Sequence, residues 1–221
     1  MDVILSPVEA RVLGCLVEKS VTNAEYYPLT LNALAAACNQ KSNRAPVMAL
    51  AETDVVRALD GLREKKLAWA VTLAGSRVPK YRHSILDVYP LTPQQLAVLC
   101  ELILRGPQTV AELRLHAGRM AGFAGIQEVQ AIVQELCAWP GGPLASKLPR
   151  QAGQREERYA HRLAGEVAVD EHAPAPAPEA ARVAVMAEND RLAALEAHVA
   201  VLQDELERLK AQFADFVKQF Q

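Results

Sequence analysis

Apolar residues recur along the first 66 positions at the spacing of buried helix faces, in which residues three and four apart share one side. The pattern predicts three helices: one that begins after Ser6, one over residues 31–38 and one over residues 52–66. The face of the first helix is formed by Val8, Val12, Leu13, Leu16 and Val17. Two β-prone runs follow, at residues 67–74 and 80–85. Three helices followed by a hairpin is the order of a winged helix.

The pattern then starts again at residue 91. The motif Leu91-Thr92-Pro93-Gln94-Gln95 matches Leu5-Ser6-Pro7-Val8-Glu9 in every role, as apolar staple, helix cap, first-turn proline and capping-box partner. The elements expected after this second start are a helix over residues 109–118, a helix over residues 126–139 and a hairpin formed by residues 147–148 and 158–161. The sequence therefore predicts a mainly α fold with some β structure (α+β), built from two tandem winged-helix domains at residues 1–90 and 91–165.

The C-terminal part of the chain has a different pattern. Alternating alanine and proline at residues 173–178 predict a semi-rigid linker, assigned to residues 166–182. Beyond it, large apolar residues alternate three and four positions apart within residues 183–221, which is the heptad spacing of a coiled-coil helix. The positions of the seam are Leu192, Leu195, Val199, Leu202, Leu206, Leu209, Phe213, Phe216 and Phe220. Because such a seam needs a partner helix, we expect a homodimer formed through it.

The composition permits a packed core, since 51% of the residues are hydrophobic and 23% are charged. The net charge of −2 hides an uneven distribution. Residues 1–90 carry 11 Lys and Arg against 9 Asp and Glu, residues 91–165 carry 8 against 6, and residues 166–221 carry 5 against 11. The two predicted domains are thus mildly basic and the tail is acidic, which points weakly toward a polyanionic partner for the domains.

The sequence contains no pattern typical of an enzyme or a membrane protein. Its five histidines and four cysteines lack metal-ligand spacing, and it has no glycine-rich phosphate loop and no nucleophile motif. We therefore expect no catalytic site, no cofactor and no metal. No apolar run reaches membrane-spanning length, and the first residues lack the pattern of a signal peptide. The widely separated cysteines are typical of buried thiols in a reducing compartment, so a cytoplasmic location is expected.

Residues 39–48, with the sequence Asn-Gln-Lys-Ser-Asn-Arg-Ala-Pro-Val-Met, are the most distinctive stretch, and we call them the signature loop. The first part is dense in side-chain donors, and polar groups that bond their own backbone favour loops. The apolar part, Pro46-Val47-Met48, is expected to turn back to the core and hold the loop in place. Two interpretations stay open: a binding loop whose donors meet a partner, or an internally hydrogen-bonded lid with Val47 and Met48 as plugs.

These motifs together resemble the YceH-type family of bacterial proteins. The resemblance rests on Glu9-Ala10-Arg11-Val12, Tyr27-Pro28-Leu29, the signature loop, Leu104-Arg105-Gly106 and Arg155-Glu156-Glu157-Arg158-Tyr159. It covers about residues 3–165 and implies two tandem winged helices, in agreement with the pattern of the residues. It implies no mechanism and no roles for individual residues.

Binding of double-stranded DNA by the first domain is the leading hypothesis, because winged helices commonly place the third helix in a groove and the wing on phosphates. Arg and Asn can read base edges, and Lys serves phosphates. The candidate residues are Asn39, Lys41, Ser42, Asn43, Arg44, Arg57, Arg63, Lys80 and Arg82. Two features count against it. Acidic residues balance the basic ones on the third helix, and its connector is far longer than the usual turn of about three or four residues.

The alternative is a protein-interaction or scaffold module that binds no nucleic acid, because a fold does not fix a function. The third helix of the second domain favours this alternative, since it offers Gln127, Gln130 and Gln134 but no Lys or Arg. The wing of that domain is basic, with Lys147, Arg150, Arg155, Arg158 and Arg162. That wing either contacts a nucleic-acid backbone non-specifically or pairs its charges locally.

Overall fold

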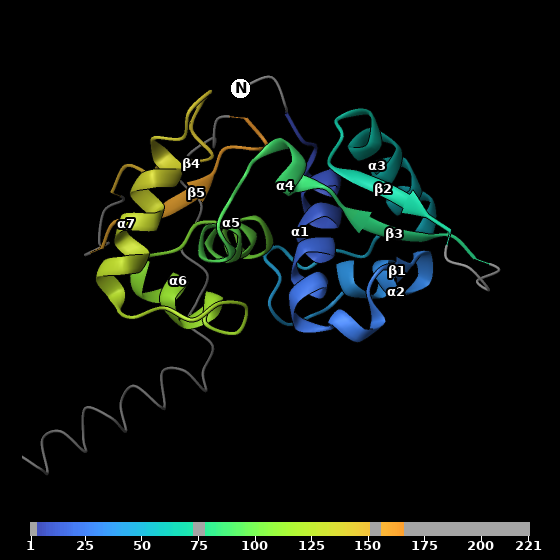
Figure 1. Ribbon diagram of the computed structural model, residues 1–221, viewed down its shortest axis with the longest axis horizontal. Helices are drawn as coiled ribbons and strands as arrows, with labels where there is room; N and C mark the ends of the chain where they lie inside the picture. Colours follow the sequence, from blue (N-terminus) through green and yellow to red (C-terminus); the bar gives the residue numbers. More distant parts are fainter. Residues whose placement is uncertain (1–3, 73–77, 151–155, 166–221) are drawn as a thin grey trace, which may run out of the picture. The chain divides into compact units, whose positions relative to one another are not determined.

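Helix α1 (Pro7–Thr22) starts where its capping residue predicts. The structure is a computed structural model, and it describes residues 4–72, 78–150 and 156–165 (Figure 1). The Ser6 hydroxyl accepts a hydrogen bond from the Glu9 N–H at 3.2 Å, and the Glu9 carboxylate accepts one from the Ser6 N–H at 2.6 Å. These two bonds satisfy N–H groups that a helix start leaves unpaired. The predicted capping box is confirmed.

The rest of the first half combines short helices with a small antiparallel sheet. Its elements are the 3₁₀ turn η1 (Ala24–Tyr26), β1 (Leu29–Thr30), α2 (Leu31–Cys38), α3 (Glu52–Glu64), β2 (Ala68–Val71), β3 (Lys80–His83) and α4 (Ile85–Val88). The strand order is β1-β3-β2, so that Tyr81 of β3 faces Leu29 on one side and Ala70 on the other. The sheet thus ties the segment before α2 to the hairpin after α3.

Several elements in this half differ from the prediction, including β2, which spans Ala68–Val71 within the expected run of residues 67–74. Helix α3 ends two residues earlier than expected, because Lys66 adopts a left-handed conformation with φ of 60°. The second hairpin run stops at His83 instead of residue 85, since the fully buried Ile85 starts α4. Strand β1 was not predicted, because two residues are too few to show an alternating pattern.

The second half repeats the order of three helices and a strand pair. Its elements are α5 (Pro93–Arg105), α6 (Val110–Ala117), α7 (Ile126–Cys137), β4 (Ala145–Lys147) and β5 (Tyr159–His161). Both predicted capping boxes are present, with Thr92 capping α5 and Thr109 capping α6. Strands β4 and β5 are antiparallel and place Ser146 opposite Ala160. The strand pair begins two residues earlier than predicted, and α7 ends two residues earlier.

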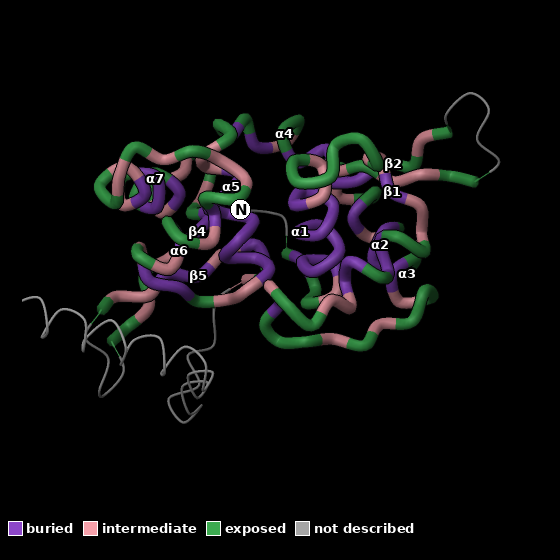
Figure 2. The backbone as a smooth tube through the Cα atoms, turned by 90° about the horizontal axis from the view of Figure 1, so that it is seen from below, coloured by how far each residue is buried: buried purple, intermediate pink, exposed green. Residues whose placement is uncertain are grey.

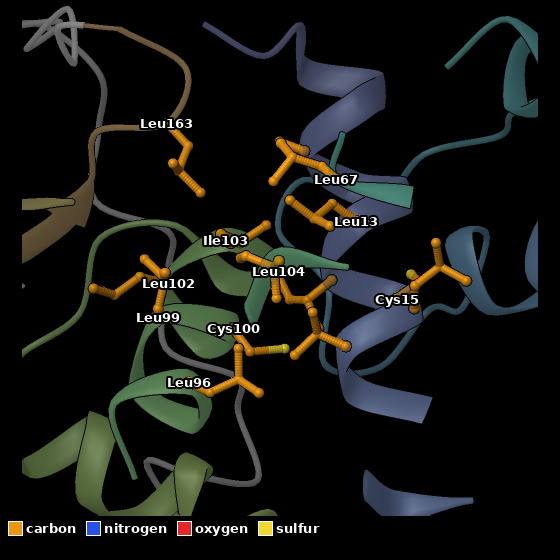
Figure 3. Close-up of a cluster of buried hydrophobic side chains, with 14 of the residues drawn as sticks. Leu13, Cys15, Leu67, Leu96, Leu99, Cys100, Leu102, Ile103, Leu104 and Leu163 are labelled. Atoms are coloured by element: carbon orange, nitrogen blue, oxygen red, sulfur yellow. The ribbon is translucent and has the colours of Figure 1, made fainter. Parts of the chain in front are cut away.

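The two halves share one hydrophobic core, in which α1 packs against α5 (Figures 1 and 3). Both helices are buried along most of their length (Figure 2). Gly14 allows the close approach, since a Cβ atom at this position would lie 2.8 Å from the Leu104 Cδ2. The Cys100 thiol donates to the Gly14 carbonyl at 3.4 Å, and the Leu5 N–H donates to the Leu163 carbonyl at 2.7 Å. The halves predicted as separate domains are therefore joined through their first helices.

The part of the chain that the structure describes is a mixed α and β fold with two small antiparallel sheets. The chain divides between residues 171 and 172, and every described residue lies before that division. The predicted linker and coiled coil fall outside the described residues, as does the expected dimerisation seam, so all three stay predictions. Within the described ranges, no helix is long and apolar enough to cross a membrane.

Candidate functional site

The ends of the connector between α2 and α3 are held together by one side chain. The Asn39 amide donates to the Leu50 carbonyl at 2.8 Å and accepts from the Leu50 N–H at 2.7 Å. These two bonds close the connector on itself just before α3 begins. Asn39 is half-buried, and the two polar groups of its amide are used inside the protein. The prediction that Asn39 contacts nucleic acid is therefore not favoured by its surroundings.

Arg44 lies at the centre of the signature loop and points into the protein. Its side chain has 0% exposure, and its guanidinium donates to both oxygens of the Glu18 carboxylate, at 2.5 Å and 3.1 Å. It also donates to the Ala37 carbonyl at 3.2 Å, the Asn43 carbonyl at 2.8 Å and the Gln40 side chain at 3.0 Å. The guanidinium is buried and its donors are occupied, so these contacts disfavour Arg44 as a candidate for contact with nucleic acid.

Glu18 connects Arg44 to the second half of the protein. Its carboxylate, 1% exposed, also pairs with Arg119 at 2.6 Å, and Arg119 pairs in turn with the fully buried Glu101 of α5 at 2.6 Å. Burial raises the pKa of Glu18, but the hydrogen bonds and charges of Arg44 and Arg119 outweigh it, so this pKa is lowered. Arg105 completes the cluster by pairing with Glu101 at 3.0 Å and donating to the Asn43 side chain. We call these residues the inter-half charge cluster.

Three arginines and two glutamates of this cluster sum to one positive charge, so the buried carboxylates are fully compensated. One backbone hydrogen bond lies beside it, from the Ala45 N–H to the Leu104 carbonyl at 2.9 Å, and Asn43 has a left-handed φ of 58°. Asparagine tolerates that conformation better than most residues. Removal of one partner of such a buried pair leaves an uncompensated charge, which is strongly destabilising. The signature loop is thus fastened to α1 and α5 at once.

A second buried arginine holds the other side of the loop. Arg11 of α1 is 2% exposed and donates to the Cys38 carbonyl at 3.1 Å and to the Pro46 carbonyl at 2.6 Å. Burial lowers the pKa of Arg11, and the neighbouring Arg44 lowers it further. Arg11 therefore ties the end of α2 and the middle of the signature loop to the core helix, and it contributes as a structural cation.

The apolar residues expected to plug the loop do not do so. Val47 is 57% exposed, Pro46 is exposed and Met48 is half-buried. The loop is pinned instead by polar contacts of Asn39 and Arg44. The lid interpretation is therefore right about internal hydrogen bonding and wrong about Val47 and Met48 as the plugs.

Five of the nine predicted contact residues are presented to solvent. They are Lys41 and Ser42 in the signature loop, Arg57 and Arg63 on α3, and Arg82 on β3. Lys80 and Asn43 are half-buried. Arg57 and Arg63 pair with Asp54 at 3.8 Å and with Asp60 at 3.4 Å, and both arginine side chains are more than half exposed. The structure therefore separates the predicted site into an exposed set and a buried set.

In the second half, the basic residues around the β4–β5 strand pair, which was predicted as a wing, are largely neutralised by their own neighbours. Glu157 pairs with Lys147 at 2.5 Å and with Arg150 at 3.4 Å, and Arg158 pairs with Glu112 at 3.3 Å. On α7, Gln130 is half-buried and donates to the Tyr159 hydroxyl at 3.3 Å. Of the two readings of this wing, local pairing is the one that these contacts favour.

The residues that hold the signature loop were missed by reasoning from sequence. Arg11, Glu18 and Glu101 stand inside otherwise apolar helical runs, and Arg119 follows the end of α6. A charge within an apolar run is the available signal, because such a residue must find a partner when its helix is buried. The partner itself could not be identified from the sequence. Among the described residues, no group of three or more His, Cys, Asp or Glu side chains is placed to hold a metal ion.

Comparisons with known proteins agree on one family. The model of the family described as "Protein of unknown function, DUF480" matches residues 5–154. A UPF0502 protein of Geobacter sulfurreducens is 51% identical over 221 residues, which covers 100% of both chains. A UPF0502 protein of Vibrio atlanticus is 45% identical over 215 residues, covering 96% of this chain and 97% of its own. The resemblance to a family of uncharacterised bacterial proteins is thus confirmed, and the chain belongs to the DUF480 (UPF0502) family.

Proposed function

We propose that each half is a winged helix and that the first half binds double-stranded DNA through phosphate contacts. The observation that carries this proposal is the placement of the exposed cations. They lie on the connector before the third helix, on the third helix itself and on the second strand of the hairpin, which are the elements that winged helices present to DNA. Lys41, Arg57 and Arg82 represent these three elements.

The outer face of α3 is suited to weak and sequence-independent binding. Its inner face is buried through Val55, Ala58, Leu59 and Leu62, which fixes the outward direction of Arg57 and Arg63. Both arginines have an acidic neighbour on the same helix, and exposed pairs of this kind contribute about 0–1 kcal/mol. A phosphate can therefore displace the carboxylate at small cost. With Arg44 buried, no arginine of the signature loop is available for a guanine edge.

The experiment is a salt titration of binding to a mixed-sequence DNA duplex, followed by fluorescence anisotropy with the full-length protein. The logarithm of affinity should fall linearly with the logarithm of salt concentration, because each neutralised phosphate releases counterions. Lys41→Ala, Arg57→Ala and Arg82→Ala should each lower affinity and flatten the salt slope by about one unit. Arg114→Ala is the matched control, since Arg114 is also an exposed cation and lies on α6 of the second half.

The control should bind DNA as the unmodified protein does. Two results would contradict the proposal: no measurable binding at low salt, or an equal loss for Arg114→Ala and the three first-half variants. The second result would mean that only the total charge matters. Swapping the duplex sequence should change affinity little, since the proposed contacts are to the backbone.

A protein-interaction role is the second candidate. The observation that favours it is the charge balance of α3, where Glu52, Asp54, Asp60 and Glu64 offset the arginines. Two joined halves whose third helices, α3 and α7, carry no net positive charge suit an adaptor for another protein. This role predicts that the unmodified protein binds no duplex even at low salt, so the same titration separates the two candidates.

We also propose a homodimer through the heptad residues 183–221 and a cytoplasmic location. The regular spacing of large apolar residues supports the first proposal, because nine such side chains exposed to water are unfavourable. Four free cysteines support the second, three of them buried and one half-buried, since thiols persist in reducing compartments.

A further inference from the structure

A hollow of about 250 Å³ lies where α1 and α5 meet. Val17 and Ser20 of α1 and His83 of β3 line it from the first half. Leu96 and Ala97 of α5 and Met120 after α6 line it from the second half. Eight of its ten lining residues are apolar, and Ser20 and His83 are the two polar ones. None of the lining residues carries a carboxylate, an ammonium or a guanidinium group.

The hydrogen bonds of Ser20 and His83 define what this hollow offers to a ligand. The Ser20 hydroxyl donates its one proton to the Val17 carbonyl at 2.8 Å, and its oxygen lies 3.0 Å from the His83 Nε2. With that proton on the Val17 carbonyl, the oxygen accepts from His83, and this arrangement places the imidazole proton on Nε2. The His83 Nδ1 is buried and has no hydrogen-bond partner among the described residues. A proton on Nδ1 would be a buried donor without an acceptor, so both observations favour the same tautomer.

The imidazole is also neutral at physiological pH. Burial, together with the positive charge of Arg82, lowers the pKa of His83 to about 4. The Ser20 oxygen is left with one free acceptor position, because a hydroxyl oxygen accepts up to two hydrogen bonds. The hollow therefore combines apolar walls and no charged lining group with an acceptor on Ser20.

We infer that this hollow binds a small, uncharged, largely apolar molecule that donates one N–H or O–H hydrogen bond to Ser20. The volume suits roughly eight to ten non-hydrogen atoms, if each takes about the 30 Å³ that a water molecule occupies in the liquid. A carboxylate or phosphate is disfavoured, because its charge would lose water without gaining a counter-charge. An aromatic or aliphatic molecule with a single donor fits the walls and the acceptor together.

Such a ligand would contact both halves of the protein. The walls of the hollow come from α1 and β3 on one side and from α5 on the other. A molecule that binds only the folded, joined arrangement stabilises it by mass action. None of the residues proposed to contact DNA lines the hollow, so its test does not depend on DNA binding.

The test uses indole and benzofuran as probes, because they have nearly the same shape and only indole has an N–H donor. Indole should bind the full-length protein saturably, with a Kd in the millimolar range or below, and should shift the methyl resonances of Met120 and Leu96 in NMR spectra. Benzofuran should bind about two- to tenfold more weakly, which is the factor given by one neutral hydrogen bond. Benzoate, which carries a charge, should not bind in the hollow.

Two variants locate the binding. Ala97→Leu should abolish indole binding by filling the hollow, since Ala97 is buried and lines it. Ser20→Ala should reduce indole binding about two- to tenfold and leave benzofuran binding unchanged. Leu115→Ala is the matched control, because Leu115 is an apolar residue with 70% exposure on α6 outside the hollow, and it should bind indole normally.

Three results would overturn the inference. The first is the absence of any Met120 shift at millimolar indole. The second is unchanged indole binding by folded Ala97→Leu protein, which would place the binding elsewhere. The third is equal affinity for indole and benzofuran, which would show that the ligand needs no hydrogen-bond donor. The comparison of the two probes needs no variant, so a failure of either variant to fold leaves the inference testable.

Discussion

Substitution of Arg44 by methionine should destabilise the protein by about 3–5 kcal/mol, the range found when one partner of a buried pair is removed. Methionine keeps a similar length and removes five donated hydrogen bonds, two of them to Glu18. The Glu18 carboxylate, 1% exposed, would stay buried. Arg119 would continue to compensate it at 2.6 Å, which places the expected loss at the lower end of that range.

A double-mutant cycle with Glu18→Gln tests whether the loss comes from this pair. Replacement of both partners of a buried pair often costs little, because no unpaired charge is left behind. We therefore expect the double variant to be less destabilised than the sum of the single variants by about 1–3 kcal/mol. The Arg63→Met variant is the control, since Arg63 pairs with Asp60 at 3.4 Å on the surface with 58% exposure. It should change stability by less than about 1 kcal/mol.

The assay is equilibrium unfolding in urea, followed by far-ultraviolet circular dichroism. An unchanged slope against urea concentration would show that the variants unfold the same surface. The reasoning would be refuted if Arg44→Met cost no more than Arg63→Met. Additive losses in the cycle would refute the direct coupling of Arg44 to Glu18.

Three further predictions follow from other parts of the structure. Gly14→Val should destabilise the protein by about 1–3 kcal/mol in the same urea assay, because its side chain would collide with Leu104 and Ile103 where α1 meets α5; a neutral result would show that the helices are not closely packed there. Burial lowers the pKa of both His83 and His161 from 6.5 to about 4. Between about pH 4 and pH 6.5 the unfolded chain therefore binds more protons than the folded protein, so the free energy of unfolding should fall as the pH drops through this range. The His83→Phe/His161→Phe variant should show a flatter stability profile across that window, and an unchanged profile would contradict the assignment. Full-length protein should sediment as a dimer and residues 1–172 as a monomer if the heptads form a coiled coil; equal monomeric masses would exclude it.

Local signals predicted the starts of helices in this fold well. The capping boxes at Ser6, Thr92 and Thr109 depend on residues three positions apart, and all three are present. Apolar periodicity likewise located α3 and α7 within two residues, because burial of one helix face is a property of the segment itself. Two-residue strand β1 and one-turn helix α4 were missed, since elements of that length leave no periodic pattern.

Which side chains of the signature loop are buried depends on residues distant in the sequence, so it could not be predicted. Lys41 and Arg44 stand three positions apart in the same polar stretch, yet Lys41 is exposed and Arg44 is buried. The difference is set by Glu18 on α1 and by Arg119 and Glu101 in the second half, which only the packing of α1 on α5 brings together. The sequence shows the donors of the loop but not the acceptors that face them.

The division of the signature loop into a structural arginine and an exposed lysine is the central claim, and one paired measurement tests it. Thermal stability and affinity for a mixed-sequence duplex would be measured on Arg44→Met and on Lys41→Ala, at a temperature where both are folded. We expect Arg44→Met to lower the melting temperature and to leave the salt slope of binding unchanged, whereas Lys41→Ala should keep the melting temperature and flatten the slope by about one unit. The reverse pattern, a stable Arg44→Met with weakened DNA binding and a destabilised Lys41→Ala with normal binding, would contradict the account.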